Sequence, residues 1–133
     1  MNPTVAFGTR LDASVARVWR LITDTHTWPL WGPSVRAVDS PERFIRAGLK
    51  GRIRTPLGNW LPFSIAAFEP EHYWDWRVCG MAATGHRVIP RGHDQCTLAF
   101  TVPVWAILYG PVCRMALVRI RRLLALSLQE DKP

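Results

Sequence analysis

Cysteine is scarce in this chain of 133 residues, which has three cysteines and no C-x-x-C pair. An odd number of widely spaced cysteines favours free thiols in a reducing compartment over a disulfide framework. No charged N-terminal region followed by an apolar segment is visible, so the sequence shows no secretory signal. These absences lead us to expect a cytoplasmic protein.

The sequence also lacks a hydrophobic run long enough to span a membrane. The most apolar stretch, residues 102–118, contains Arg114 and is interrupted by Pro103, Gly110 and Pro111. A spanning helix needs roughly 20 consecutive apolar residues. We therefore predict that this stretch belongs to a water-soluble fold.

Motifs for metals, phosphates and paired-carboxylate chemistry are missing as well. The histidines have neither helical i, i+4 spacing nor a cysteine pair nearby, which argues against a zinc site. No glycine-rich phosphate loop follows a predicted strand. We therefore expect no metal and no obligatory cofactor.

Basic residues outnumber acidic ones by 17 to 10, which gives a formal net charge of +7. The arginines are spread along the chain and form no nucleic-acid signature, so we expect no specific nucleic-acid partner. A weak attraction to an anionic membrane surface is compatible with this charge. The sequence leaves the oligomeric state open.

Hydrophobic residues make up 48% of the chain, and its length suits a single domain over residues 1–133. Residues 4–11 alternate as in a strand, and a short amphipathic helix is predicted to begin at Val15. We interpret residues 25–33, with two prolines and a glycine, as a loop. Residues 43–46 are one of several short strand candidates that follow.

The middle of the chain predicts an antiparallel meander with one apolar face. The last segment predicts a long helix from about residue 104 to 128, with Tyr109, Cys113, Ala116 and Ile120 on its apolar side. That side must cover something, and the sheet is the obvious partner. The prediction is an α+β helix-grip fold: a curved antiparallel sheet of about six to seven strands around a long C-terminal helix, with one or two short helices after the first strand.

Several motifs occur in a recognisable order along the chain. They are Val15-x-x-Val18-Trp19-x-x-Ile22-x-Asp24, Trp28-x-x-Trp31, Phe68-Glu69-Pro70 with Trp74-x-Trp76, and Gly85-His86-Arg87-Val88-x-Pro90 followed by Thr97-Leu98-Ala99-Phe100. This order resembles the SRPBCC superfamily, which includes START, polyketide cyclase/dehydrase and pollen-allergen-like helix-grip proteins. The resemblance implies an apolar cavity between sheet and long helix, and it leaves the activity open, because members range from lipid carriers to aromatase/cyclases.

The candidate ligand-binding residues are side chains predicted to face this cavity or to close it. They are Trp19, Trp28, Trp31, Phe63, Trp74, Trp76, His86, Phe100, Tyr109, Cys113 and Ala116. Tryptophan can surround flat apolar ligands, but it also fills ordinary cores, and the two alternatives stay open. Trp28 and Trp31 are preferred because a loop is where a lid would be.

His86, Tyr109 and Cys113 are the weak candidates for catalysis. A Cys113–His86 dyad has no flanking acid, so a structural role is favoured for both. Burial without a nearby acid is expected to lower the pKa of His86 below its free value of roughly 6.5. We predict that His86 is the polar anchor of an apolar pocket, with Tyr109 or Arg54 as alternatives.

These observations favour binding, or transport, of a hydrophobic small molecule or lipid. The alternative is an enzyme of the polyketide cyclase/aromatase kind that uses His86 and Tyr109. A third class, a domain that docks another protein, would use the basic face of the last helix.

Overall fold

The computed structural model describes residues 4–130, apart from the side chains of residues 105, 107 and 127–130. Seven antiparallel strands form one curved sheet in the order β1-β7-β6-β5-β4-β3-β2. The strands are β1 (Thr4–Leu11), β2 (Ala37–Asp39), β3 (Lys50–Arg54), β4 (Trp60–Glu69), β5 (Tyr73–Val78), β6 (Met81–Pro90) and β7 (Cys96–Pro103).

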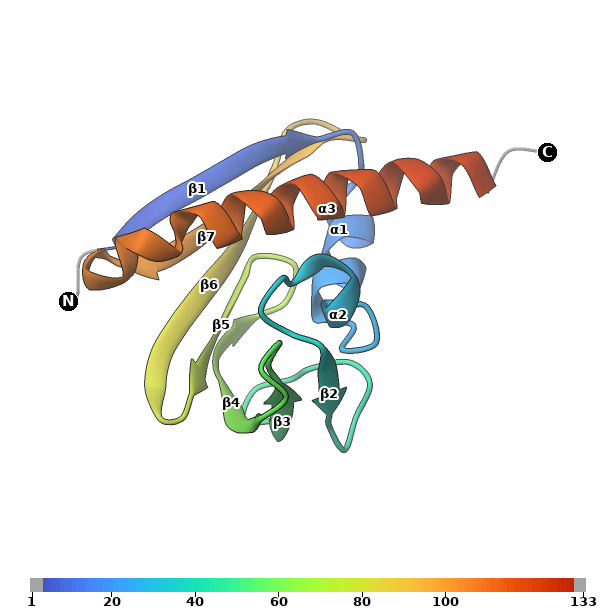
Figure 1. Cartoon of the computed structure of the whole chain (residues 1–133). Coiled ribbons are helices and arrows are strands. Elements are labelled where there is room, and N and C mark those ends of the chain that lie inside the picture. The colour runs from blue at the N-terminus through green and yellow to red at the C-terminus, as the bar shows by residue number, and fades with distance from the viewer. Residues whose placement is uncertain (1–3, 131–133) are drawn as a thin grey trace.

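Helices cover one side of this sheet. They are α1 (Val15–Thr23), α2 (Trp28–Trp31), the 3-10 helix η1 (Val104–Tyr109) and α3 (Gly110–Glu130). Helix α3 passes in front of the strands in Figure 1, and it contacts α2, β1 and β7. This arrangement confirms the predicted α+β helix-grip fold.

The core lies between α3, α1 and the inner face of the sheet. Leu98, Phe100 and Val102 of β7 are buried, as their alternation predicts. On α3, Cys113 and Ile120 are buried too, as helical spacing predicts. Within the described part of the chain, no helix combines the length and the apolarity needed to cross a membrane.

Helix α1 begins where its sequence predicts. The side chain of Ser14 caps it by accepting a hydrogen bond from the backbone N–H of Arg17 at 3.2 Å. Val18 and Ile22 are fully buried on its inner face.

The loop prediction for residues 25–33 is wrong at its centre, where α2 forms. Pro29 lies in the first turn of this helix, where a missing backbone N–H costs nothing. Trp28 and Trp31 are 2% and 6% exposed, so they are core side chains and not a solvent-exposed lid.

One strand prediction also needs correction, and one strand departs from regular alternation. Residues 43–46 form no strand, and only Phe44 makes an isolated bridge, to Asp24. In the sequence of β4, the alternation of Leu61, Phe63 and Ile65 would continue to Ala67, but the pairing with β5 shifts between Ile65 and Phe68 and breaks it. Phe68 instead packs against the core.

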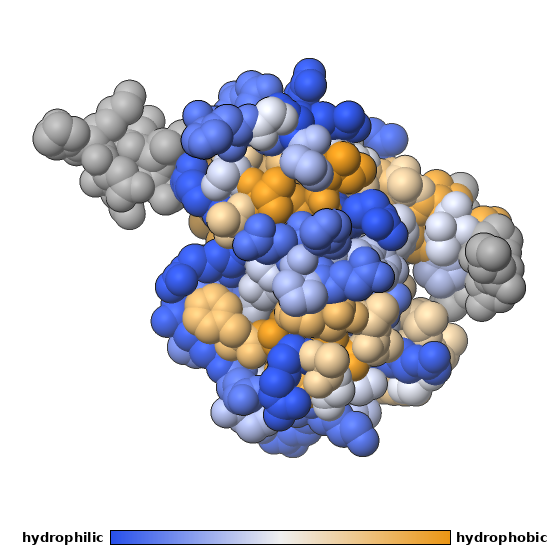
Figure 2. All heavy atoms as spheres, turned by 180° about the vertical axis from the view of Figure 1, so that it is seen from behind, coloured by the Kyte–Doolittle hydropathy of each residue, from blue (hydrophilic) through white to orange (hydrophobic). Residues whose placement is uncertain are grey.

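The face opposite to that of Figure 1 is mostly hydrophilic, with separate hydrophobic areas between the polar residues (Figure 2).

Candidate functional site

A stack of three aromatic rings forms the centre of the molecule. Trp74 of β5 lies parallel to Trp28 of α2, with ring centroids 5.5 Å apart, and parallel to His86 of β6 at 3.9 Å. Phe63 and Trp76 meet Trp28 at tilted or edge-on angles, at 5.6 and 5.3 Å. Edge-on and offset contacts of this kind stabilise aromatic clusters beyond their buried area.

A directed chain of hydrogen bonds holds His86 inside this cluster. Trp76 Nε1 donates to Thr84 Oγ1 at 2.9 Å, and Thr84 Oγ1 lies 3.4 Å from His86 Nε2. On the other side of the ring, Nδ1 lies 3.3 Å from the backbone oxygen of Trp74. A neutral imidazole with its proton on Nδ1 satisfies every member of this chain, because it donates to Trp74 and accepts from Thr84.

The protonation state of His86 follows from its burial. The residue is 2% exposed, and desolvation lowers its pKa to about 3, although the hydrogen bond to the Trp74 carbonyl opposes that shift. At neutral pH the ring is therefore an uncharged part of the core.

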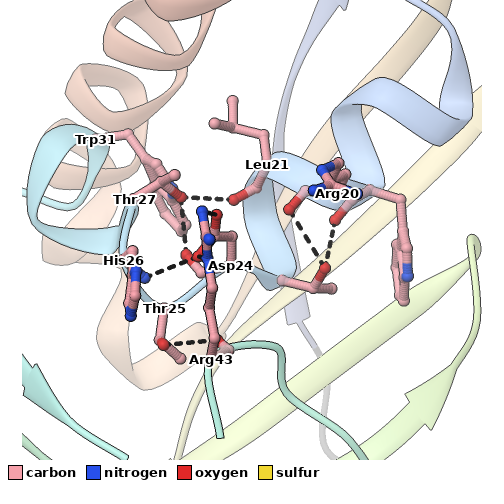
Figure 3. A network of polar contacts seen from close by, with 10 residues as sticks. Arg20, Leu21, Asp24, Thr25, His26, Thr27, Trp31 and Arg43 are labelled. Carbon is pink, nitrogen blue, oxygen red and sulfur yellow. Dashed lines mark hydrogen bonds and ion pairs between the residues drawn. The ribbon is translucent and has the colours of Figure 1, made fainter.

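A second polar network positions α2 (Figure 3). The buried carboxylate of Asp24 accepts hydrogen bonds from Arg43 Nε and Nη2 at 3.0 and 2.9 Å, and one from the backbone N–H of His26 at 3.0 Å. Burial acts to raise the pKa of Asp24, but these hydrogen bonds outweigh it and lower the pKa below its ordinary value. Thr27 Oγ1 donates to the backbone oxygen of Leu21 at 2.7 Å and accepts from Trp31 Nε1 at 3.3 Å. The network joins the end of α1 to α2, which holds Trp28 and Trp31 in place.

Two hollows lie between the sheet and the helices. The inner cavity has a volume of about 40 Å³ and is bounded by Trp31, Trp74, His86, Phe100, Cys113 and Ala116, among others. It has room for a water molecule or a small group of a ligand, but not for a whole ligand.

The outer cavity is ligand-sized, with a volume of about 370 Å³. Its walls are mostly aliphatic and include Ile53, Leu61, Val78, Met81, Val102 and Ala106. Ile53 and Val102 are buried at its base, whereas Leu108 is 91% exposed at its rim. A hollow of about 440 Å³ beside Arg10, Asp12 and Arg121 is larger, but its charged wall does not suit an apolar ligand.

The inner and outer cavities share part of their walls. Ser34, Trp76, Thr84 and Tyr109 line both of them. The hydroxyl oxygens of Ser34 and Tyr109 lie 2.6 Å apart, so a hydrogen bond joins the loop after α2 to the end of η1 at this boundary.

The structure distributes the predicted site residues over three environments. Most of them line the inner cavity, and of these only Trp76 and Tyr109 also reach the outer one. Phe63 packs against Trp28 and Trp76, and Trp19 packs against Phe68 at 5.6 Å. Neither Phe63 nor Trp19 is among the described residues that line the two cavities.

The aliphatic wall of the outer cavity was missed by sequence reasoning, which favoured aromatic residues. Strand alternation places Leu61, Val78 and Val102 on the inner face, so that signal was available. No sequence signal marks Ala106 as a wall residue, because η1 begins after the last strand and follows no simple period.

The three weak candidates for catalysis are uncharged at neutral pH. Burial raises the pKa of Cys113 to about 11, and it also raises the pKa of Tyr109. With His86 neutral as well, an activated thiolate–imidazolium pair is not favoured. Arg54, the alternative anchor, donates to the backbone oxygen of Gly58 at 3.2 Å and is not among the described residues that line either cavity.

Among the described residues, no three His, Cys, Asp or Glu side chains come close enough together to hold a metal ion.

Solved structures share this fold over most of their length. An uncharacterised protein from Bacillus thuringiensis aligns with a TM-score of 0.70 and 14% identity, over 91% of this chain and 98% of its own. The protein XoxI from Bacillus cereus aligns with a TM-score of 0.70 and 15% identity, over 90% and 94%. Norcoclaurine synthase from Thalictrum flavum aligns with a TM-score of 0.64 and 14% identity, over 93% and 94%. At these identities the likeness shows the fold alone.

No curated protein matches the sequence. The family model described as polyketide cyclase / dehydrase and lipid transport matches residues 4–125, which is nearly the whole chain. The chain belongs to this family.

Proposed function

We propose that the protein binds a hydrophobic small molecule in the outer cavity. The observation that carries this proposal is an aliphatic hollow of about 370 Å³ with a buried base and an exposed rim. Sites of this volume and polarity are typical of small-molecule binding. Trp76 and Tyr109 are the two predicted ligand-binding residues that would contact such a molecule.

Two further points favour binding over catalysis. The family description includes lipid transport, an activity that needs a binding cavity and no catalytic group. The cyclase alternative needs a general acid or base, whereas the pKa of His86 is about 3 and that of Tyr109 is raised. The other predicted site residues that line the inner cavity enter this proposal as the packed side chains next to the ligand.

The test is a titration with N-phenyl-1-naphthylamine, an uncharged apolar dye that fluoresces in apolar surroundings. Ala106 is half-buried in the cavity wall, so the substitution Ala106→Phe would fill part of the hollow. We expect saturable binding at a ratio near one to one, weakened at least tenfold in this variant. Ala47→Phe adds the same ring at an exposed position and is the matched control.

Failure to saturate, with the protein folded, would contradict the binding function. Equal dye affinity in Ala106→Phe and Ala47→Phe would place the ligand outside this cavity.

We also propose a weak contact between the outer face of α3 and anionic lipid surfaces, from which an apolar ligand could be exchanged. Met115, Val118 and Leu126 are about half exposed on this helix. Arg119 and Arg122 lie among them, and no acidic residue occurs between residues 104 and 126. Exposed apolar groups beside cationic ones are typical of surfaces that rest on anionic lipid.

A further inference from the structure

The described walls of the outer cavity contain no ionisable group that is charged at neutral pH. Their polar side chains are the hydroxyl groups of Ser34, Thr55, Thr84 and Tyr109 and the indole of Trp76, whose Nε1 already donates to Thr84. The inner cavity adds His86 and Cys113, both of which burial keeps neutral. A ligand with a charged group would therefore lose water there without gaining an opposite charge, which strongly disfavours its binding.

The hydroxyl groups are concentrated at the boundary between the two cavities. Ser34 and Tyr109 share one hydrogen bond at 2.6 Å, in which either oxygen could be the donor. Whichever donates, the other keeps its own O–H, and both oxygens keep lone pairs. The pair can therefore donate to a carbonyl oxygen or accept from a hydroxyl group.

A third polar group lies in the wall of the inner cavity. Trp74 is 1% exposed, and its Nε1 has no hydrogen-bond partner among the described residues. A buried N–H without an acceptor is unfavourable. The inner cavity has a volume of about 40 Å³, which is enough for one water molecule. An oxygen-bearing group of a ligand could take the place of that water molecule.

We propose that the ligand is an uncharged apolar molecule with a hydroxyl or carbonyl oxygen, whose tail fills the outer cavity and whose oxygen binds at the Ser34–Tyr109 pair. This inference rests on the proposed binding function and names the chemical class of its ligand. Hydroxyls at the boundary would set the orientation of the molecule, while the aliphatic wall would supply most of the affinity.

The test is displacement of N-phenyl-1-naphthylamine near pH 7.5 by three probes with equal chain length: 1-decanol, 2-decanone and decanoate. We expect the alcohol and the ketone to displace the dye at concentrations at least tenfold lower than decanoate, because the carboxylate is charged at this pH. The variants Ser34→Ala and Tyr109→Phe should each weaken 1-decanol about 5- to 10-fold more than they weaken the dye, which contains no oxygen.

The control variant is Tyr73→Phe, which removes the same phenolic hydroxyl from a tyrosine that is not among the described residues lining either cavity, and it should leave 1-decanol affinity within twofold. Decanoate that binds as well as 1-decanol would overturn the inference, and so would 1-decanol affinity unchanged in both Ser34→Ala and Tyr109→Phe. In either case dye binding that is still blocked by Ala106→Phe would leave the binding function intact. If the wild-type protein does not bind the dye at all, the binding function itself is refuted.

Discussion

His86 is the residue whose chemistry depends most on its surroundings. In water its imidazole would titrate near pH 6.5, but here it lies between Trp74 and Phe100, with ring centroids at 3.9 and 4.8 Å. Its two nitrogen atoms are engaged by Thr84 and by the backbone of Trp74. The ring therefore behaves as a flat core side chain with two polar ends.

This environment predicts a pH dependence of stability. The pKa of His86 is about 3 in the folded protein and near 6.5 in the unfolded chain. Below pH 6.5 only the unfolded chain gains the proton, so the free energy of unfolding should fall by about 1.4 kcal/mol per pH unit between pH 6 and pH 4.5. Urea titrations followed by tryptophan fluorescence at several pH values would measure the slope.

The control separates His86 from the other histidines. His86→Phe should have a nearly flat profile in this window, although it starts less stable because the Trp74 carbonyl loses its donor. His93→Gln, at an exposed position, should keep the wild-type slope. Asp24 does not interfere, because its pKa lies below 3.8 and its stabilisation is lost only as pH falls through that lower range. A wild-type profile as flat as that of His86→Phe would refute the assignment.

At the scale of elements, one face of α3 packs on the sheet and covers the core. Ile120 is fully buried, whereas Arg122, two residues later, is exposed. Arg121 differs from Arg122, because its guanidinium donates hydrogen bonds to Thr9 Oγ1 and to the backbone oxygen of Arg10 on β1. The helix is thus fixed to the sheet by apolar packing beneath and by arginine at its edge.

Substitutions on the two faces of α3 should lower the free energy of unfolding by unequal amounts. Ile120→Asp buries a charge without a partner and should lower the free energy of unfolding by more than about 3 kcal/mol. Arg122→Asp should change it by less than about 1 kcal/mol. Thermal denaturation would compare them.

If Ile120→Asp does not fold, Ile120→Val provides a measurable value, with an expected loss of about 0.5–1.5 kcal/mol. Equal melting temperatures for Ile120→Val, Arg122→Asp and the wild type would show that the face is wrongly assigned.

At the scale of the whole molecule, charge and apolar surface occur together. The chain carries a net charge of +7, and the outer face of α3 presents methionine, valine and leucine beside arginines. Attraction of such a surface to anionic lipid is screened by salt.

Vesicle sedimentation would test the proposed lipid contact. The protein should bind vesicles of about 30% phosphatidylserine at about 20 mM NaCl, and most binding should disappear at about 300 mM NaCl. Val118→Ser should reduce binding at low salt, whereas Leu57→Ser, at a position that is 94% exposed on another surface, should not. Equal binding to vesicles without anionic lipid would exclude the electrostatic contact.

The fold was largely predictable because the hydrophobic periodicity of the sequence matches the buried faces of the strands and helices. Alternation in β7 and helical spacing in α3 predict the buried faces that contain Phe100 and Ile120. The same reasoning failed where periodicity is broken, at the shifted pairing in β4 and at the single turn of α2, which begins with Trp28 and Pro29. A four-residue helix is too short for any repeating pattern to mark it.

The sequence alone determined most of the inward faces of strands and helices, and therefore that His86 would lie in apolar surroundings without an acid. It did not determine where those inward side chains fill space and where they leave it empty. Trp28, Trp74 and His86 come from three elements and stack into a nearly solid floor, whereas Ile53, Val102 and Ala106 leave a ligand-sized hollow beside it. A cavity is the volume left over when side chains from many elements have packed together. Local sequence patterns contain no information about this empty volume, so only the tertiary structure decided where the cavity lies.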